Sequence, residues 1–140
     1  MSYKHYAIMS AMMVGAGMLS TMNVWAEQWD DIRFSLNDLY MILLMTGWML
    51  LFMGAYDGEG VVAVVGLVLV VKGVVCIRTQ AFIGERQYLL GMIPHHSMAV
   101  HMTKKLLGKA ATVRPELKPF LENIVRTQEE EIRVMKTPPP

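Results

Sequence analysis

Two neighbouring histidines, His95 and His96, stand in a short segment that is rich in methionine. Three of the four histidines and three of the fourteen methionines of the chain fall within residues 92–102. Imidazole nitrogen and thioether sulfur suit a soft or borderline metal ion, with Cu(I) as the best match. The segment lacks cysteine and carboxylate, which argues against a structural zinc site. It therefore predicts a copper site; the alternative is that the histidines face solvent or close a helix end while the methionines pack.

A helix through this segment gathers its donor side chains on one side, at about 100° of rotation per residue. The donors on or beside that side are Met92, His95, His96, Met98 and Met102. His101 points away from it. For a lone histidine the packing alternative would be preferred, but two adjacent histidines with flanking methionines favour a ligand set.

A second stripe near the C-terminus offers partners. Gln128, Glu131 and Met135 recur at spacings of three and four residues, so they line one face of a helix. Folded back on the first segment, this face could add an oxygen ligand or accept a hydrogen bond from a histidine N–H. Residues 129–131 are also an acidic run, and without the histidine segment beside it a solvated surface is the stronger interpretation.

The elements that hold these residues follow from three apolar runs, at about 6–25, 39–56 and 61–77. The chain is 54% hydrophobic and 18% charged, which is typical of membrane proteins. The first run matches the length that a helix needs to cross about 30 Å of hydrocarbon, and the other two fall at the short end of the range for a span. Lys72, the one charged residue in these runs, can reach the headgroups with its long side chain. We therefore expect three transmembrane helices.

The first run has an alternative interpretation as a secretory signal cleaved after Ala26. Its length, and the presence of Tyr6 and Asn23 within it, favour an uncleaved span.

The remaining residues, 78–140, hold ten of the thirteen basic residues of the chain. Apolar residues at helical spacing predict helices over about 82–107 and 115–136, with Gly108 as the stop between them. Pro94 is expected to kink the first helix or to mark its true start. We thus expect an all-α membrane protein with a membrane domain, 1–77, and a two-helix hairpin domain, 78–140.

A row of methionines also runs along the second apolar run. Met41, Met45, Met49 and Met53 fall every four residues, so they form one slowly winding stripe. The stripe could pass a soft cation through the bilayer or hold it there. Helix packing is the preferred interpretation, because thioethers are weak ligands without an imidazole or thiolate nearby.

The motif residues resemble a known family. The string Gly91-Met92-Ile93-Pro94-His95-His96, followed by Ile124, Gln128, Glu131-Ile132 and Met135, resembles the family called domain of unknown function 305. The segments His5-Tyr6, Leu39-Tyr40-Met41 and Arg78-Thr79-Gln80 are similar to its membrane-anchored branch. This resemblance implies a ferritin-like helical bundle and copper binding. It implies a ligand set of Met92, His95, His96, Gln128, Glu131 and Met135, and relatives often carry methionine near Met102.

A two-helix hairpin is about half of a four-helix bundle, so two copies could complete one. We therefore expect a homodimer or higher oligomer in the lipid bilayer, with a copper donor or acceptor protein as a further partner. Thirteen Lys and Arg against twelve Asp and Glu give no basic excess that would indicate nucleic-acid binding.

Three spans place the two termini on opposite sides of the membrane. Lys4 on one side, against Arg33, Arg78 and Arg86 on the other, favours a cytoplasmic hairpin. The secreted relatives and the preference of thioether sites for oxidising compartments favour the outside. We expect a bacterial inner-membrane protein with an extracytoplasmic hairpin.

The function expected from these observations is copper handling or resistance by a binding protein that is not an enzyme. One alternative is a membrane scaffold whose hairpins assemble oligomers and whose histidines are structural. Another is a ferritin-like metal oxidase, but such di-iron sites use Glu-x-x-His pairs, and the sequence has none.

Overall fold

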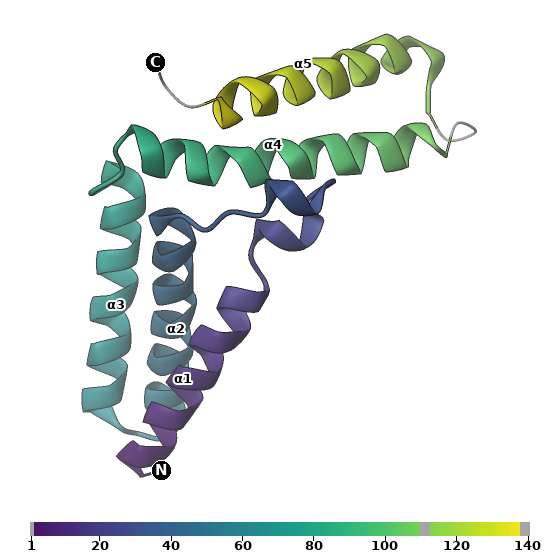
Figure 1. The fold of residues 1–140 in the computed structure, drawn as a ribbon. Helices are drawn as coiled ribbons and strands as arrows, with labels where there is room; N and C mark the ends of the chain where they lie inside the picture. The colour runs from purple at the N-terminus through teal and green to yellow at the C-terminus, as the bar shows by residue number, and fades with distance from the viewer. Residues whose placement is uncertain (1, 110–112, 138–140) are drawn as a thin grey trace. The chain divides into compact units, whose positions relative to one another are not determined.

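The computed structural model describes residues 2–109 and 113–137, and all regular structure in these residues is helical. Figure 1 shows the helices α1 (Tyr3–Leu19), α2 (Leu36–Tyr56), α3 (Gly60–Thr79), α4 (Glu85–Leu107) and α5 (Lys118–Lys136). Short 3-10 turns are η1 (Met22–Trp25), η2 (Trp29–Asp31) and η4 (Pro115–Leu117). The predicted all-α class is confirmed for the described residues.

The chain forms two compact units. The first, called here the membrane unit, has residues 2–21 and 35–84 as its described part. The second, called the hairpin unit, has residues 22–34, 85–109 and 113–137. The structure groups residues 22–34, called here the linker, with the hairpin. The reason is a set of polar contacts between the linker and α4 and α5, described below.

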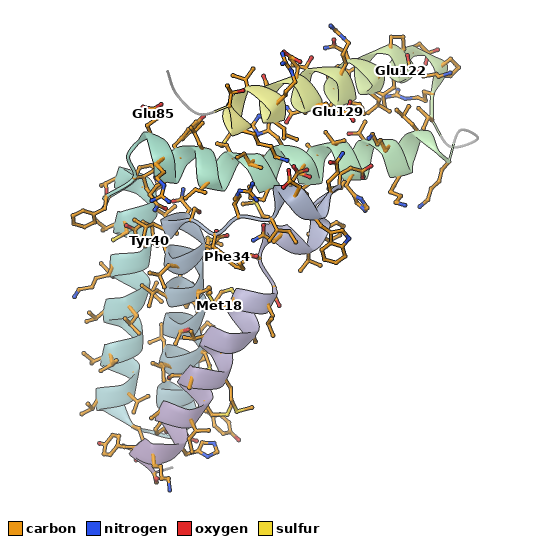
Figure 2. All side chains as sticks on the ribbon, viewed as in Figure 1. Met18, Phe34, Tyr40, Glu85, Glu122 and Glu129 are labelled. Atoms are coloured by element: carbon orange, nitrogen blue, oxygen red, sulfur yellow. The ribbon has the colours of Figure 1, made fainter. Side chains whose placement is uncertain are left out.

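Three helical segments are long and apolar enough to cross a membrane: Tyr3–Trp25, Leu36–Tyr56 and Gly60–Thr79. Figure 2 shows that the nitrogen and oxygen atoms of the side chains concentrate on α4 and α5. The second segment begins three residues before the predicted start, because Asp38 lies in the first turn of α2 and caps it. The Ser35 backbone N–H donates to Asp38 Oδ2 at 2.8 Å, and the two residues form a capping box.

Glycines allow α2 and α3 to pack with their backbones in contact. A Cβ atom on Gly66 would lie 2.3 Å from the Leu51 nitrogen, and one on Gly54 would lie 2.4 Å from the Ala63 nitrogen. Small residues at such crossings are typical of helices that associate in membranes.

Helix α1 packs against α2 and the α2–α3 turn. Tyr6 is buried with Leu50 and Val62 in one apolar cluster. Its hydroxyl also donates a hydrogen bond to Asp57 Oδ2 at 2.6 Å. Residues 6–21 of the first apolar run are therefore part of the membrane unit.

In the hairpin unit, α4 and α5 run side by side in opposite directions (Figure 1). Their core consists of Ile93, Val100 and Ile132, with Val125 and Met135 packed against it. Helix α4 begins at Glu85 and continues through the buried Pro94, so the expectation that Pro94 could mark the true start of the helix is wrong. Tertiary burial offsets the backbone hydrogen bond that proline cannot make.

The linker lies against the hairpin through its acidic residues. The Ser97 hydroxyl, fully buried on α4, donates to Asp31 Oδ2 at 2.5 Å and accepts a bond from the Glu27 backbone N–H at 2.8 Å. Lys136 Nζ on α5 lies 2.6 Å from carboxylate oxygens of both Asp30 and Asp31. Charge pairing thus holds the linker on both helices.

Candidate functional site

Four of the predicted ligands line one cavity between α4 and α5. The cavity has a volume of about 290 Å³. The residues from the predicted ligand set that line it are Met92, His96, Glu131 and Met135. Two come from successive turns of α4 and two from successive turns of α5, so antiparallel pairing of the helices brings them together.

The orientation of His96 is set from both sides of its ring. Its Nδ1 lies 2.8 Å from the Met92 carbonyl oxygen, which can only accept, so Nδ1 carries the proton and donates. Its Nε2 then faces Glu131 Oε2 at 2.9 Å. A neutral ring with the proton on Nδ1 presents a lone pair to a carboxylate oxygen there. Such a pair of facing acceptors is stabilised by a proton or by another cation between them.

The other predicted ligands on α4 lie outside this cavity. His95 is exposed, Met102 is 51% exposed and Met98 is half-buried. The rings of His95 and His96 meet edge to face with centroids 6.2 Å apart. Because adjacent residues on a helix are rotated by about 100°, α5 covers His96 while His95 stays in solvent. The donors of the motif therefore divide between an inner and an outer side of α4.

Gln128, the remaining predicted ligand, is half-buried on α5 and does not line the cavity. Among the residues that the structure describes, no group of three or more His, Cys, Asp or Glu side chains is placed to hold a metal. A metal site in this cavity must therefore draw on the thioether sulfurs of Met92 and Met135.

The four methionines of the stripe on α2 lie in two different surroundings, two packed and two exposed. Met49 and Met53 pack against the apolar cluster of Tyr6, Leu50 and Val62. Met41 and Met45 are 50% and 42% exposed on the outer surface of the helix. Half of the stripe is thus engaged in helix packing.

A second polar cluster was not predicted from the sequence. Glu27 of the linker accepts from Lys104 Nζ at 3.2 Å and lies 3.0 Å from His101 Nδ1. Lys104 also pairs with Glu129 of α5 at 2.8 Å, a residue labelled in Figure 2. His101, which does not line the cavity around His96, thus meets the linker. Its spacing of three residues from Lys104 places both on one face of α4, which is the signal that sequence alone offers.

The charges of this cluster shift the pKa values of two of its side chains. Burial raises the pKa of Glu27, but hydrogen bonds from Lys104 and His101 outweigh it, so the net pKa is lowered. The hydrogen bond to Glu129 is the main cause that raises the pKa of Lys104. Both groups are therefore held in their charged forms near neutral pH.

Comparison with known proteins covers most of the chain. Residues 77–138 match the family described as Domain of unknown function (DUF305). The chain is also 42% identical over 130 residues to the Uncharacterized protein L153 of Acanthamoeba polyphaga mimivirus, which covers 87% of this chain and 82% of that protein. The chain belongs to the DUF305 family. The predicted resemblance is thereby confirmed, and no solved structure matches the chain.

The DUF305 match begins near the end of α3 and covers both helices of the hairpin. It therefore contains every residue that lines the cavity around His96.

Proposed function

We propose that this DUF305 chain is a membrane-anchored copper-binding protein that takes copper into the cavity between α4 and α5. The observation that carries the proposal is the meeting of Met92, His96, Glu131 and Met135 around one cavity. The protein would serve copper handling or resistance as a binding module, receiving the ion from a donor or passing it to an acceptor protein.

The chemistry of these side chains suits Cu(I). Two thioethers and one imidazole are soft to borderline donors, which select Cu(I) over harder ions. The hydrogen bond from Nδ1 to the Met92 carbonyl fixes the ring so that Nε2 is the nitrogen available to a metal. Glu131 lies beside Nε2 and would balance the positive charge of the ion.

We infer that the hairpin lies outside the cytoplasm and pairs with a second copy. Thioether sites suit oxidising compartments, so the hairpin of an inner-membrane protein would face outward. Phe120 and Val134 of α5 are 58% and 60% exposed and offer an apolar surface to a second copy. Pairing of two hairpins would build a four-helix bundle.

The proposal is tested by titrating the detergent-purified full chain with Cu(I) against a competing chelator. Met92→Leu with Met135→Leu removes two sulfurs while nearly conserving volume, so the hairpin should still fold. We expect Cu(I) affinity to fall by at least about tenfold, or about 1.4 kcal/mol. Met98→Leu with Met102→Leu, on the outer part of α4, is the matched control and should bind as the wild type does. Equal affinities for all three proteins would overturn the proposal.

A second candidate function is a membrane scaffold in which the histidines are structural. The observation that favours it is that both ring nitrogens of His96 already face protein oxygens. This candidate predicts an oligomer whose size is unchanged by chelator and by His95→Ala with His96→Ala. A copper-dependent oligomer, measured by light scattering, would count against it.

A further inference from the structure

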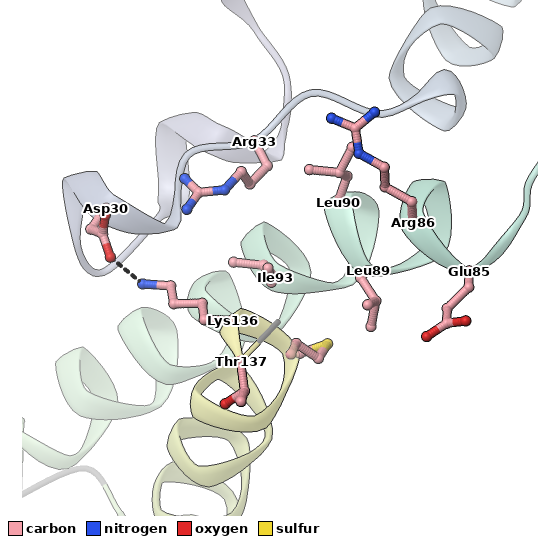
Figure 3. Close-up of a pocket in the computed structure, with 10 residues that line it drawn as sticks. Asp30, Arg33, Glu85, Arg86, Leu89, Leu90, Ile93, Lys136 and Thr137 are labelled. Atoms are coloured by element: carbon pink, nitrogen blue, oxygen red, sulfur yellow. Dashed lines mark hydrogen bonds and ion pairs between the residues drawn. The ribbon is translucent and has the colours of Figure 1, made fainter. Parts of the chain in front are cut away.

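A larger cavity lies elsewhere in the hairpin unit, where the linker meets the start of α4 and the end of α5 (Figure 3). Its volume is about 700 Å³. The apolar residues that line it are Leu89, Leu90, Ile93 and Met135. Its charged residues are Asp30, Arg33, Glu85, Arg86 and Lys136. The cavity thus combines an apolar floor with a charged rim.

Two cations of this rim, Arg33 and Arg86, form no ion pair with a carboxylate of the described residues. The hydrogen bond from Lys136 lowers the pKa of Asp30, and the charge of Arg33 contributes to lowering it. Lys136 is paired with Asp30, as the dashed line in Figure 3 shows, and with Asp31. The Arg33 guanidinium donates to the backbone carbonyl of Ile32 at 2.7 Å. Within residues 2–109 and 113–137, neither Arg33 nor Arg86 forms an ion pair with a carboxylate.

The remaining acid of the rim does not neutralise these arginines. In Figure 3 the Glu85 carboxylate is directed away from both guanidinium groups. Leu90 lies between the side chains of Arg33 and Arg86 in the same view. The cavity therefore suits a ligand whose anionic group contacts the arginines and whose apolar part contacts the apolar lining residues.

Both arginines are close along the chain to segments that can cross the bilayer. Arg33 precedes the start of α2 at Leu36 by three residues, and Arg86 follows the end of α3 at Thr79 by seven. An extended chain reaches at most about 10 Å and about 25 Å over these lengths. The rim therefore lies within reach of the lipid headgroups, where the most abundant ligands with an anionic head and an apolar body are phospholipids.

We propose that this cavity binds an anionic phospholipid, with its phosphate at the part of the rim that Arg33 and Arg86 line and an acyl chain along the apolar residues. Guanidinium groups suit this role because their planar fork of donors matches the oxygens of a phosphate. This cavity is separate from the one that we propose to bind copper, although Met135 lines both.

Native mass spectrometry of the detergent-purified full chain tests the proposal. The protein is mixed with equal amounts of phosphatidylglycerol and phosphatidylcholine, and the ratio of the two bound lipids is measured. We expect the wild type to retain phosphatidylglycerol at least about fivefold over phosphatidylcholine. Arg33→Gln with Arg86→Gln should bring the ratio close to one. Arg114→Gln with Arg126→Gln removes the same charge from exposed positions outside the cavity and should keep the wild-type ratio.

Three results would overturn the proposal: equal retention of both lipids by the wild type, an equal loss in both double variants, or full displacement of the lipid by inorganic phosphate. The last would identify a site for free phosphate in place of a lipid. Arg86 is exposed, so Arg86→Gln alone provides a variant that keeps the fold and should still lower the ratio.

Discussion

At the scale of single residues, the contact between His96 and Glu131 decides how the cavity between α4 and α5 can act. The distance from Nε2 to Oε2 is 2.9 Å, and the Nδ1 side of the ring is occupied by the Met92 carbonyl. Helical spacing in the sequence placed His96 on one face of α4 and Glu131 on one face of α5, and it predicted that these two faces could meet. It could not predict that His95 would remain outside, since that depends on how α5 lies across α4.

Glu131→Gln is expected to weaken Cu(I) binding by about tenfold, the range for residues that orient a metal ligand. The amide N–H of the new side chain can donate to Nε2 and occupy the lone pair that a metal would use. The hairpin should keep its stability to within about 1 kcal/mol, because a hydrogen bond between the helices remains. Chelator competition and thermal unfolding measure the two effects. Glu130→Gln is the control with the same loss of charge; equal weakening by both variants would contradict the assigned role.

Acid should loosen the linker from α4. The pKa of Glu27 is lowered from its ordinary value of 4.5, so its carboxylate contributes stability that is fully present above pH 4.5 and is lost as the pH falls through the lowered value. In Glu27→Gln, the free energy of unfolding should fall less steeply between pH 7 and pH 3, with a total loss smaller by on the order of 1 kcal/mol. Denaturant unfolding of the detergent-purified chain between pH 7 and pH 3 measures it. An identical slope in the variant would show that Glu27 does not hold the linker.

At the scale of elements, the sequence predicted the helices whose length and position depend on local residue patterns. Apolar length predicts the three spans, and helical periodicity predicts α4 and α5 to within a few residues. The exact starts depend on caps, and Asp38 shows why: a charged residue that reads as a boundary belongs to the first turn of α2. The path of α4 through Pro94 depends on tertiary burial, which periodicity does not report.

The close backbone contact between α2 and α3 leaves no room for a larger side chain at Gly66. Gly66→Ala should destabilise the membrane unit by about 1–3 kcal/mol, because the added methyl would meet the Leu51 backbone. Gly15→Ala is the matched control: nothing lies within 4 Å of its added methyl, and alanine favours a helix by up to about 1 kcal/mol. Thermal unfolding in detergent compares the two. Destabilisation of both to the same degree would contradict the packing described here.

At the scale of the whole molecule, the chain is divided into two units that do not follow its order. Residues 22–34 include the end of the first candidate span and the connection to the second, yet they belong to the hairpin unit, where Glu27, Asp30 and Asp31 form ion pairs. The sequence holds only a weak signal for this arrangement, namely an acidic linker and a basic hairpin in one chain. Which acid meets which base depends on contacts between residues 74 to 106 positions apart.

The central claim is that thioether sulfur and imidazole nitrogen in the hairpin bind copper together. X-ray absorption spectroscopy of the Cu(I)-loaded, detergent-purified chain tests it most directly. Copper in the wild type should have sulfur and nitrogen neighbours, and the sulfur contribution should be lost in Met92→Leu with Met135→Leu. A spectrum that is the same in the wild type and this variant would contradict it.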